Sequence, residues 1–338
     1  MTRQVTTTLT NRLSPRTLLP LVAAVAGCVA PFVMGDLTFL MRMVLAAIVV
    51  TGLSLLMGYA GQASLGQGAF VAAGAITVAL GTTRFGLPPL LTLVAAPFVA
   101  GAFAAVVGVP LLRLKGHYLA FGTLALLLMV QTVMSTLEFF GGSFGISGIP
   151  PFGVGGTVFA DQRPYVLLAL GLLGVVLFVN HRIVNSRFGR GVRALAGSET
   201  AAESAGVPVM RSKLTIFALS AMYAGLAGAL SAFFTPYVSP DSFPALESFT
   251  YVIMAVVGGL GTLWGGVVGA VLVSTLLQVL NNVSSNPDLP PTLGPILQYA
   301  TYGGLLVLAL LFMPRGIVPA VESGVGRVAA RPRAVART

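Results

Sequence analysis

The chain has 338 residues, of which 56% are hydrophobic and only 8% charged, whereas a soluble domain holds roughly 25% charged residues. Its uncharged stretches reach 41 residues, and a membrane-spanning helix needs about 20. Composition therefore excludes a soluble globular domain and indicates one polytopic membrane domain. The net charge of +10 fits basic residues gathered at one membrane face better than a nucleic-acid-binding surface. The single cysteine, Cys28, excludes an intrachain disulfide and a CxxC metal site.

The first apolar stretch, 17–35, follows three arginines and superficially resembles a secretory signal peptide. We predict instead an uncleaved first span, because the stretch is long and further spans follow almost at once.

The later uncharged stretches predict the remaining spans; in chain order they are 43–83, 85–112, 118–137, 139–160, 164–181, 214–240, 248–287 and 289–314. Stretch 139–160 is rich in glycine and contains two adjacent prolines, so we expect an ordered loop at the membrane face. The two longest stretches each have room for two spans and a glycine-rich break near the middle, "GYAGQASLGQG" and "GGLGTLWGG". The sequence thus predicts an all-α membrane protein with about ten transmembrane helices.

The distribution of basic residues supports this count. Ten spans place both termini on one side, and sixteen of the 19 basic residues then fall on that side, which the positive-inside rule makes cytoplasmic. Arg42, Arg84 and Arg163 remain at the outer edge. The predicted organisation is a cytoplasmic tail over 1–16, a membrane domain over 17–314 with a cytoplasmic loop at 181–213, and a basic cytoplasmic tail over 315–338.

Residues for catalysis are scarce. The two histidines, His117 and His181, lie at predicted inner span ends and favour solvated or headgroup-facing rings. Neither lysine belongs to a phosphate-binding GxxxxGK[ST] loop, so any ATP must be bound by another chain. No metal-ligand spacing occurs. We expect no enzyme activity, no cofactor and no metal in this chain.

Ion coupling also lacks its usual groups, because ion-driven transporters keep carboxylates inside the membrane. Glu138 and Glu247 lie at predicted outer span ends, where interfacial positions are expected. Arg42, near a span interior, is expected to snorkel outward.

The loop 181–213 is the longest charged stretch, and its middle predicts a short helix. Ser198 is a suitable N-cap, Glu199 lies in the first turn where the helix dipole favours an anion, and Gly206 followed by Pro208 ends the helix. Such a capped helix outside the membrane is suited to docking, and the alternative is a solvated connector.

The spacing of Ala201, Ala202, Gly206 and Ile216 in this loop resembles the EAA signature of membrane subunits of ABC importers. Glu199 stands two places before Ala201 rather than one, and the leucine-proline that usually follows the isoleucine is missing. These departures are similar to the variant found in branched-chain amino acid permease subunits.

Other segments resemble the second, longer permease subunit of that family; they are "GYAGQASLGQGAF", "LRLKGHYLAFGTLAL", "GGSFGISGIP", "SAMYAGLAGALSA", "SPDSFPALESF" and "VVGGLGTLWGGVVGA". The resemblance covers about residues 40–315 in the same order. It implies a vitamin-B12-importer-like permease bundle in a bacterial inner membrane. It also implies a second homologous permease subunit, two ATP-binding cassette subunits and a periplasmic substrate-binding protein as partners, besides membrane lipid.

The resemblance further implies that Glu199, Ala201, Ala202 and Gly206 form the surface that seats in the ATPase.

Broken helix ends are tolerated inside a membrane where they line a polar cavity or are buried in protein. Gln62, Ser64 and Gln67 of the first break are therefore candidates for the translocation path. The alternative is that the glycines of this break allow a close turn, with the amides satisfying exposed backbone.

The expected function is import of branched-chain or other hydrophobic amino acids. Urea and short-chain amides are alternative cargoes, because their importers use similar permeases. An ion-coupled secondary carrier and a structural scaffold without transport are the alternatives from other classes.

Overall fold

The computed structural model describes residues 36–154, 157–158 and 162–284, together with positions 296, 300, 303, 304 and 316–318. The predicted first span, 17–35, and the N-terminal tail, 1–16, lie outside the described residues. The last span, 289–314, and the C-terminal tail, 315–338, lie outside them as well, apart from those isolated positions.

The structure is built from helices. In chain order they are α2 (Leu37–Ser54), which continues as the π-helical turn η1 (Leu55–Tyr59), α3 (Gln67–Thr83), α4 (Pro89–Leu111), α5 (His117–Thr136), α6 (Gln162–Asn185), α7 (Arg187–Gly197), α8 (Glu199–Ser204), α9 (Val209–Phe234), α10 (Ala245–Gly258) and α11 (Gly265–Ser284). In the described ranges, six helical segments have the length and apolarity to cross a membrane, and α3 is a shorter apolar helix. The chain is thus a helical, multi-pass membrane protein.

Both predicted breaks are confirmed. The stretch 43–83 is interrupted between Tyr59 and Gln67, and the stretch 248–287 between Gly258 and Gly265. Glycine is a poor helix former, so a cluster of glycines ends one helix before the next begins.

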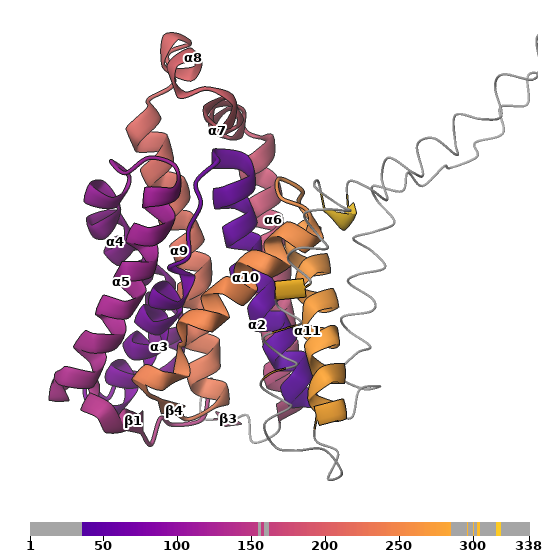
Figure 1. Cartoon of the computed structure of the whole chain (residues 1–338). Coiled ribbons are helices and arrows are strands. Elements are labelled where there is room, and N and C mark those ends of the chain that lie inside the picture. Colours follow the sequence, from indigo (N-terminus) through magenta and orange to yellow (C-terminus); the bar gives the residue numbers. More distant parts are fainter. Residues whose placement is uncertain are drawn as a thin grey trace, which may run out of the picture.

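The predicted loop 139–160 is confirmed as irregular structure with short elements. They are the 3-10 turns η2 (Glu138–Phe140) and η3 (Gly142–Phe144) and the strands β1 (Ile146–Ser147), β2 (Gly153–Val154) and β3 (Thr157–Val158). Strand β1 pairs antiparallel with β4 (Tyr237–Val238), which follows α9 and precedes the 3-10 turn η4 (Pro240–Ser242), and β2 pairs with β3. These strands lie at one end of the bundle, and α7 and α8 lie at the other (Figure 1).

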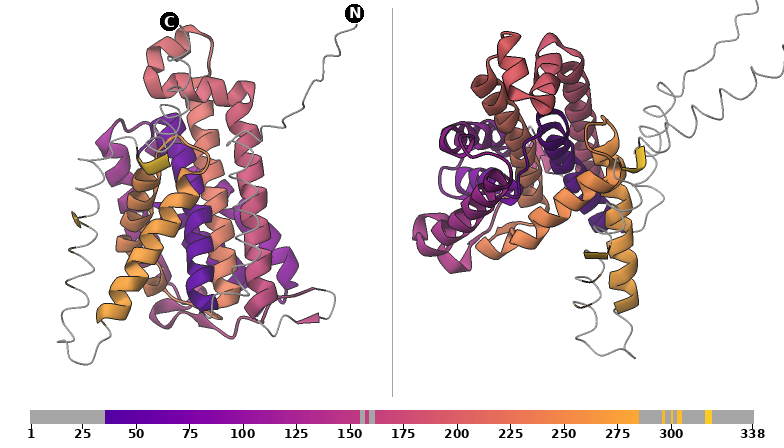
Figure 2. Two further views of the ribbon diagram at one scale, coloured as in Figure 1. Left: turned by 90° about the vertical axis from the view of Figure 1, so that its right-hand side faces the viewer. Right: turned by 45° about the horizontal axis from the view of Figure 1, so that its top comes forward.

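Helices α2 and α9 form the centre of the bundle. In their apolar windows 78% and 72% of residues are buried, against 33% or less in α4, α5, α6 and α11. The outer helices expose large apolar side chains, including Phe98, Phe121 and Phe178, and such a surface is stable in lipid. Figure 2 shows from two further directions that α2 and α9 lie next to each other in the middle of the bundle, with other helices on either side.

Small residues set the spacing between the central helices. A Cβ on Gly225 of α9 would lie 3.2 Å from the carbonyl oxygen of Ala96 in α4, and one on Gly228 would lie 3.0 Å from the backbone nitrogen of Ala75 in α3. Lipid gives no hydrophobic drive between helices, so close backbone approach supplies the packing energy. The glycines of the run 225–232 thus let α9 pack closely against α3 and α4.

Basic residues are unequally divided between the two ends. The end with α7 and α8 receives Arg113, Lys115, Arg182, Arg187, Arg190, Arg193, Arg211 and Lys213, whereas Arg42, Arg84 and Arg163 belong to the end with the strands. This is the asymmetry that the ten-span arrangement predicts for the described residues.

Candidate functional site

The first break brings two distant glycine-rich segments together. After η1 the chain turns at Gly61, whose φ is +65°, and re-enters a helix at Gln67. Gly58 lies against the second break, where a Cβ would stand 2.6 Å from the Cα of Gly261 and 2.9 Å from the carbonyl carbon of Leu260. The backbones of the two breaks therefore touch, which only glycine at position 58 permits.

Hydroxyl groups from other helices satisfy the backbone of this break. The N–H of Leu65 donates to Thr123 Oγ1 of α5 at 2.9 Å, and the N–H of Gly68 donates to Ser248 Oγ of α10 at 3.0 Å. The first N–H groups of any helix lack intrahelical acceptors, and burying them unpaired is costly. These two hydroxyls make the buried start of α3 possible, and sequence reasoning did not single them out.

The three candidate path residues are all buried. Gln62, Ser64 and Gln67 are 4%, 1% and 1% exposed. Ser64 Oγ accepts from the Gly66 N–H at 3.4 Å, and Gln67 Nε2 donates to Ser220 Oγ of α9 at 3.1 Å. The glycines thus make the close turn, but the amides do not satisfy its backbone.

Several polar atoms near this break lack a partner among the described residues. They are Oε1 and Nε2 of Gln62, Oε1 of Gln67 and the hydroxyl of Tyr223, which follows Ser220 by one turn of α9. An unpaired buried amide or hydroxyl costs about 1 to 3 kcal/mol. The break therefore holds unused hydrogen-bonding capacity in the centre of the bundle.

The helix predicted within the loop 181–213 is confirmed as α8. Ser198 Oγ accepts from the Ala201 N–H at 3.3 Å, as expected of an N-cap. At the other end the N–H of Val207 donates to the Ala202 carbonyl at 3.0 Å and that of Gly206 to the Glu203 carbonyl at 2.9 Å. With Gly206 at φ +80°, this is a Schellman motif, which requires a left-handed residue at that place.

The four predicted coupling residues divide into two groups. Ala202 is 1% exposed and faces the protein, whereas Glu199, Ala201 and Gly206 are exposed. Glu199 forms an ion pair with Lys213 at the start of α9, which sequence reasoning missed. A Cβ on Gly206 would meet nothing within 4 Å, so only its backbone conformation demands glycine within this chain.

The segment α7–α8 also contacts the first break. The guanidinium of Arg193 in α7 lies 5.9 Å from the ring centre of Tyr59 and donates to the Val184 carbonyl at 2.7 Å. A Cβ on Gly61 would lie 3.4 Å from the Cα of Ala196. A displacement of α7 would therefore change the contacts that hold the turn between α2 and α3.

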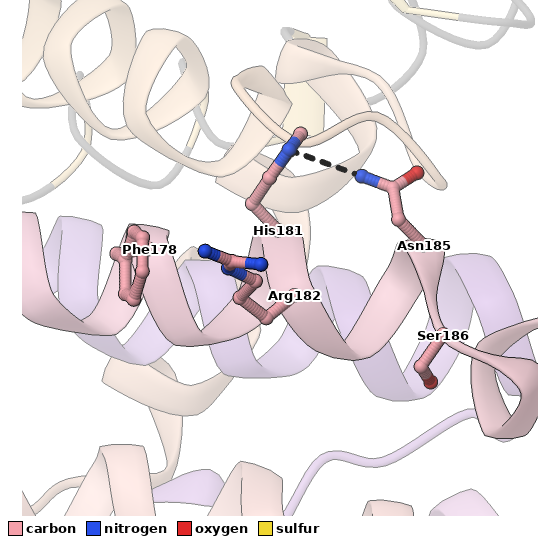
Figure 3. A pocket seen from close by; sticks show the side chains of 5 residues that line it. All are labelled: Phe178, His181, Arg182, Asn185 and Ser186. Carbon is pink, nitrogen blue, oxygen red and sulfur yellow. Dashed lines mark hydrogen bonds between the residues drawn. The ribbon is translucent and has the colours of Figure 1, made fainter.

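A shallow hollow of about 560 Å³ lies at the end of α6 (Figure 3). Arg182 stacks on Phe178 at 5.1 Å, and the ring of His181 is directed toward the Asn185 amide, with 3.2 Å between their nitrogens. All the residues that line it come from one helix and its end. In the described part of the chain no three His, Cys, Asp or Glu residues come together as metal ligands.

Comparison with known proteins gives a consistent result. The family described as "Branched-chain amino acid transport system / permease component" matches residues 35–310. The chain is 34% identical over 292 residues to the "High-affinity branched-chain amino acid transport system permease protein LivM" of Salmonella typhimurium and 33% identical to that of Escherichia coli. It is 28% identical over 242 residues to the "Probable branched-chain amino acid transport permease protein LivM" of Methanocaldococcus jannaschii.

These matches cover much of each protein. The alignments with the Salmonella and Escherichia proteins take in 79% of this chain and 66% of the relatives' length, and the alignment with the Methanocaldococcus protein takes in 68% of each. No solved structure matches. Since the family match spans the described membrane helices and both breaks, the chain belongs to the permease components of branched-chain amino acid transport systems.

Proposed function

We propose that the chain is the membrane-spanning permease subunit of an ATP-driven importer for branched-chain or other hydrophobic amino acids. The relatives that it matches over most of its length are named for transport of branched-chain amino acids, which supports this cargo. The observation that carries the proposal is the exposed, doubly capped helix α8, which stands outside the bundle while its neighbour α7 touches the first break.

In the proposed assembly this chain provides the path through the membrane, and separate subunits bind ATP and deliver the cargo. Two ATP-binding cassette subunits seat against α8 through Glu199, Ala201 and Gly206, and Ala202 anchors the helix from below. A second, homologous permease subunit completes a vitamin-B12-importer-like bundle of about ten spans per chain. A periplasmic binding protein delivers the cargo at the end that carries the strands. The membrane is a bacterial inner membrane, with α7, α8 and both termini in the cytoplasm.

The proposed path passes the first break. Gln62, Ser64 and Gln67 are neutral, so they offer hydrogen bonds to a zwitterion without holding it tightly. The unpaired amide atoms of Gln62 and Gln67 support this role, because a passing solute or water would supply the partners that the described residues lack. ATP-driven movement of α7 would reach this point through Tyr59 and Gly61.

The experiment that tests the proposal separates partner contact from backbone strain at Gly206. Gly206→Asn keeps a residue that tolerates a left-handed backbone, whereas Gly206→Trp adds bulk on the exposed side. We expect the Trp variant to lose ATPase association and leucine uptake, the Asn variant to retain most of both, and membrane abundance to stay normal. Gly197→Trp is the matched control, since Gly197 also has open space around it but an ordinary φ.

Charge reversal tests the same surface independently. Glu199→Lys breaks the ion pair with Lys213, and adding Lys213→Glu restores that pair with opposite polarity. If Glu199 contacts the ATPase, the double variant still lacks ATPase association and leucine uptake, although the ion pair within the chain is restored. Full leucine uptake by Gly206→Trp and Glu199→Lys would refute a docking role for α8. Uptake that survives ATP depletion but collapses with the ion gradient would instead favour a secondary carrier.

A further inference from the structure

A second cavity lies at the end of the bundle that carries the strands. It has a volume of about 440 Å³, within the range of small-molecule sites, and its walls come from α2, α9, α10 and α11. Arg42 contributes from the second turn of α2 and Glu247 from the first turn of α10. From the sequence, Arg42 was expected to snorkel outward from near a span interior and Glu247 to lie at the interface, yet in the structure both line one cavity.

The two charges are held without pairing to each other. No ion pair joins Arg42 and Glu247, so their charged nitrogen and oxygen atoms are more than 4.0 Å apart. The hydroxyl of Tyr251 donates to Glu247 Oε1 at 2.9 Å and fixes the carboxylate from one side. Arg42 and Glu247 both line the cavity and are exposed residues, while Tyr251 is 6% exposed.

The rest of the wall is mixed, with apolar side chains beside hydroxyl groups and the amides of Gln278 and Asn281. Leu45, Phe243, Met254 and Leu277 line it together with small and hydroxyl-bearing residues. A charged side chain within a membrane domain is expensive unless it has a partner or a function. A cation and an anion on the neighbouring helices α2 and α10, beside an apolar part of the wall, are complementary to a molecule that carries both charges and an aliphatic group.

We propose that this cavity is a receiving subsite for a free zwitterionic amino acid with an aliphatic side chain. The guanidinium of Arg42 holds the α-carboxylate, because its planar donors match a carboxylate pair. Glu247, positioned by Tyr251, takes the α-ammonium, and the aliphatic side chain lies on the apolar wall. The inference rests on the proposed function, since it places the cargo at the face where a binding protein would release it.

A phospholipid with an ethanolamine headgroup shares part of this chemistry, because it also joins an ammonium group to an anionic oxygen. The test must therefore distinguish leucine from that headgroup. Ser274 lines the cavity on α11, and a cysteine there in a Cys28→Ser background reports occupancy through its reaction rate with a small neutral thiosulfonate reagent. The measurement uses the assembled transporter without its binding protein.

We expect leucine to slow the modification of Ser274→Cys in a saturable way. Leucinamide, which lacks the carboxylate, and 4-methylpentanoate, which lacks the ammonium, should protect at least tenfold less well at equal concentration. Ser143→Cys, exposed at the same end outside the cavity, should show no protection by leucine. Protection by glycerophosphoethanolamine but not by leucine would assign the cavity to lipid and overturn the proposal, as would a Ser274→Cys that never reacts.

Substitutions of Arg42 and Glu247 then test which charged group of leucine each side chain binds. Arg42→Gln should raise the half-protecting leucine concentration at least tenfold and abolish the preference for leucine over leucinamide. Glu247→Gln should abolish the preference for leucine over 4-methylpentanoate. Arg84→Gln is the matched control, because Arg84 lies at the same end but donates to the Glu138 carbonyl outside the cavity. Unchanged preferences in both cavity variants would overturn the inference.

Failure of the subsite and failure of the proposed function give different results. If wild-type transporter takes up leucine but leucine never protects Ser274→Cys, only the subsite is wrong. If wild-type transporter takes up no leucine, the cargo itself is wrong.

Discussion

Contact between the two glycine-rich breaks predicts that Gly58→Ala disturbs the centre of the bundle. The added Cβ would stand 2.6 Å from Gly261 Cα and 2.9 Å from the carbonyl carbon of Leu260. Non-bonded carbons sit at about 3.5 to 4.0 Å, so the backbones must separate by roughly 1 Å. Neither neighbour is the end of a flexible side chain, so this strain cannot be relieved by a rotamer change. Overpacking of this kind costs about 1 to 3 kcal/mol.

Thermal unfolding of the purified protein in detergent measures this cost. With about 2 °C lost per kcal/mol for a long chain, Gly58→Ala should lower the midpoint by roughly 2 to 6 °C. Gly171→Ala is the matched control, because a Cβ there meets nothing within 4 Å and alanine favours the helix. A midpoint for Gly58→Ala equal to or above that of Gly171→Ala would refute the close contact of the two breaks.

The remaining predictions concern topology, energy and the buried hydroxyls. In a Cys28→Ser background, Ser198→Cys should be labelled from the cytoplasm only and Ser147→Cys from outside only; reversed labelling would overturn the orientation. The purified chain alone should hydrolyse no ATP above a mock preparation. Micromolar nucleotide binding by this chain without a partner would contradict the proposal that a separate subunit binds ATP. Thr123→Val should destabilise the protein by about 1 to 3 kcal/mol in denaturation assays, because the part-buried N–H of Leu65 loses its acceptor. Thr132→Val, whose hydroxyl is exposed and bonds within its own helix, should be near neutral, and equal losses would refute the reasoning.

Local features of the site were predictable from sequence. Ser198 and Gly206 lie within a few residues of the groups they cap, so chemistry and spacing together indicate the ends of α8. The two breaks were predictable for a similar reason, because clustered glycines end a helix wherever they stand. The residues that contact each break could not be predicted from this local pattern.

The partners of the first break lie far away in the chain. Thr123, Ser220 and Ser248 are 58, 153 and 180 residues from the groups that they bind. Hydroxyl residues are frequent in such helices, and nothing in their spacing distinguishes these three. Lys213 and Arg193 were counted only as basic loop residues, because an ion pair or a ring contact depends on how the helices return to one another.

The sequence alone determined that the chain crosses a membrane, where its helices break and which residues cap its exposed helix, because apolar length, glycine and capping act over a few residues. Tertiary structure decided that the two breaks touch, that α7 reaches the first of them, and that Arg42 and Glu247 share one cavity. Helix packing is governed by small residues and shape rather than by a hydrophobic drive, so the neighbour of each face cannot be read from composition. In the sequence, Arg42 and Glu247 are two unrelated charges near the starts of different helices. They line one cavity because α2 and α10 pack side by side in the structure.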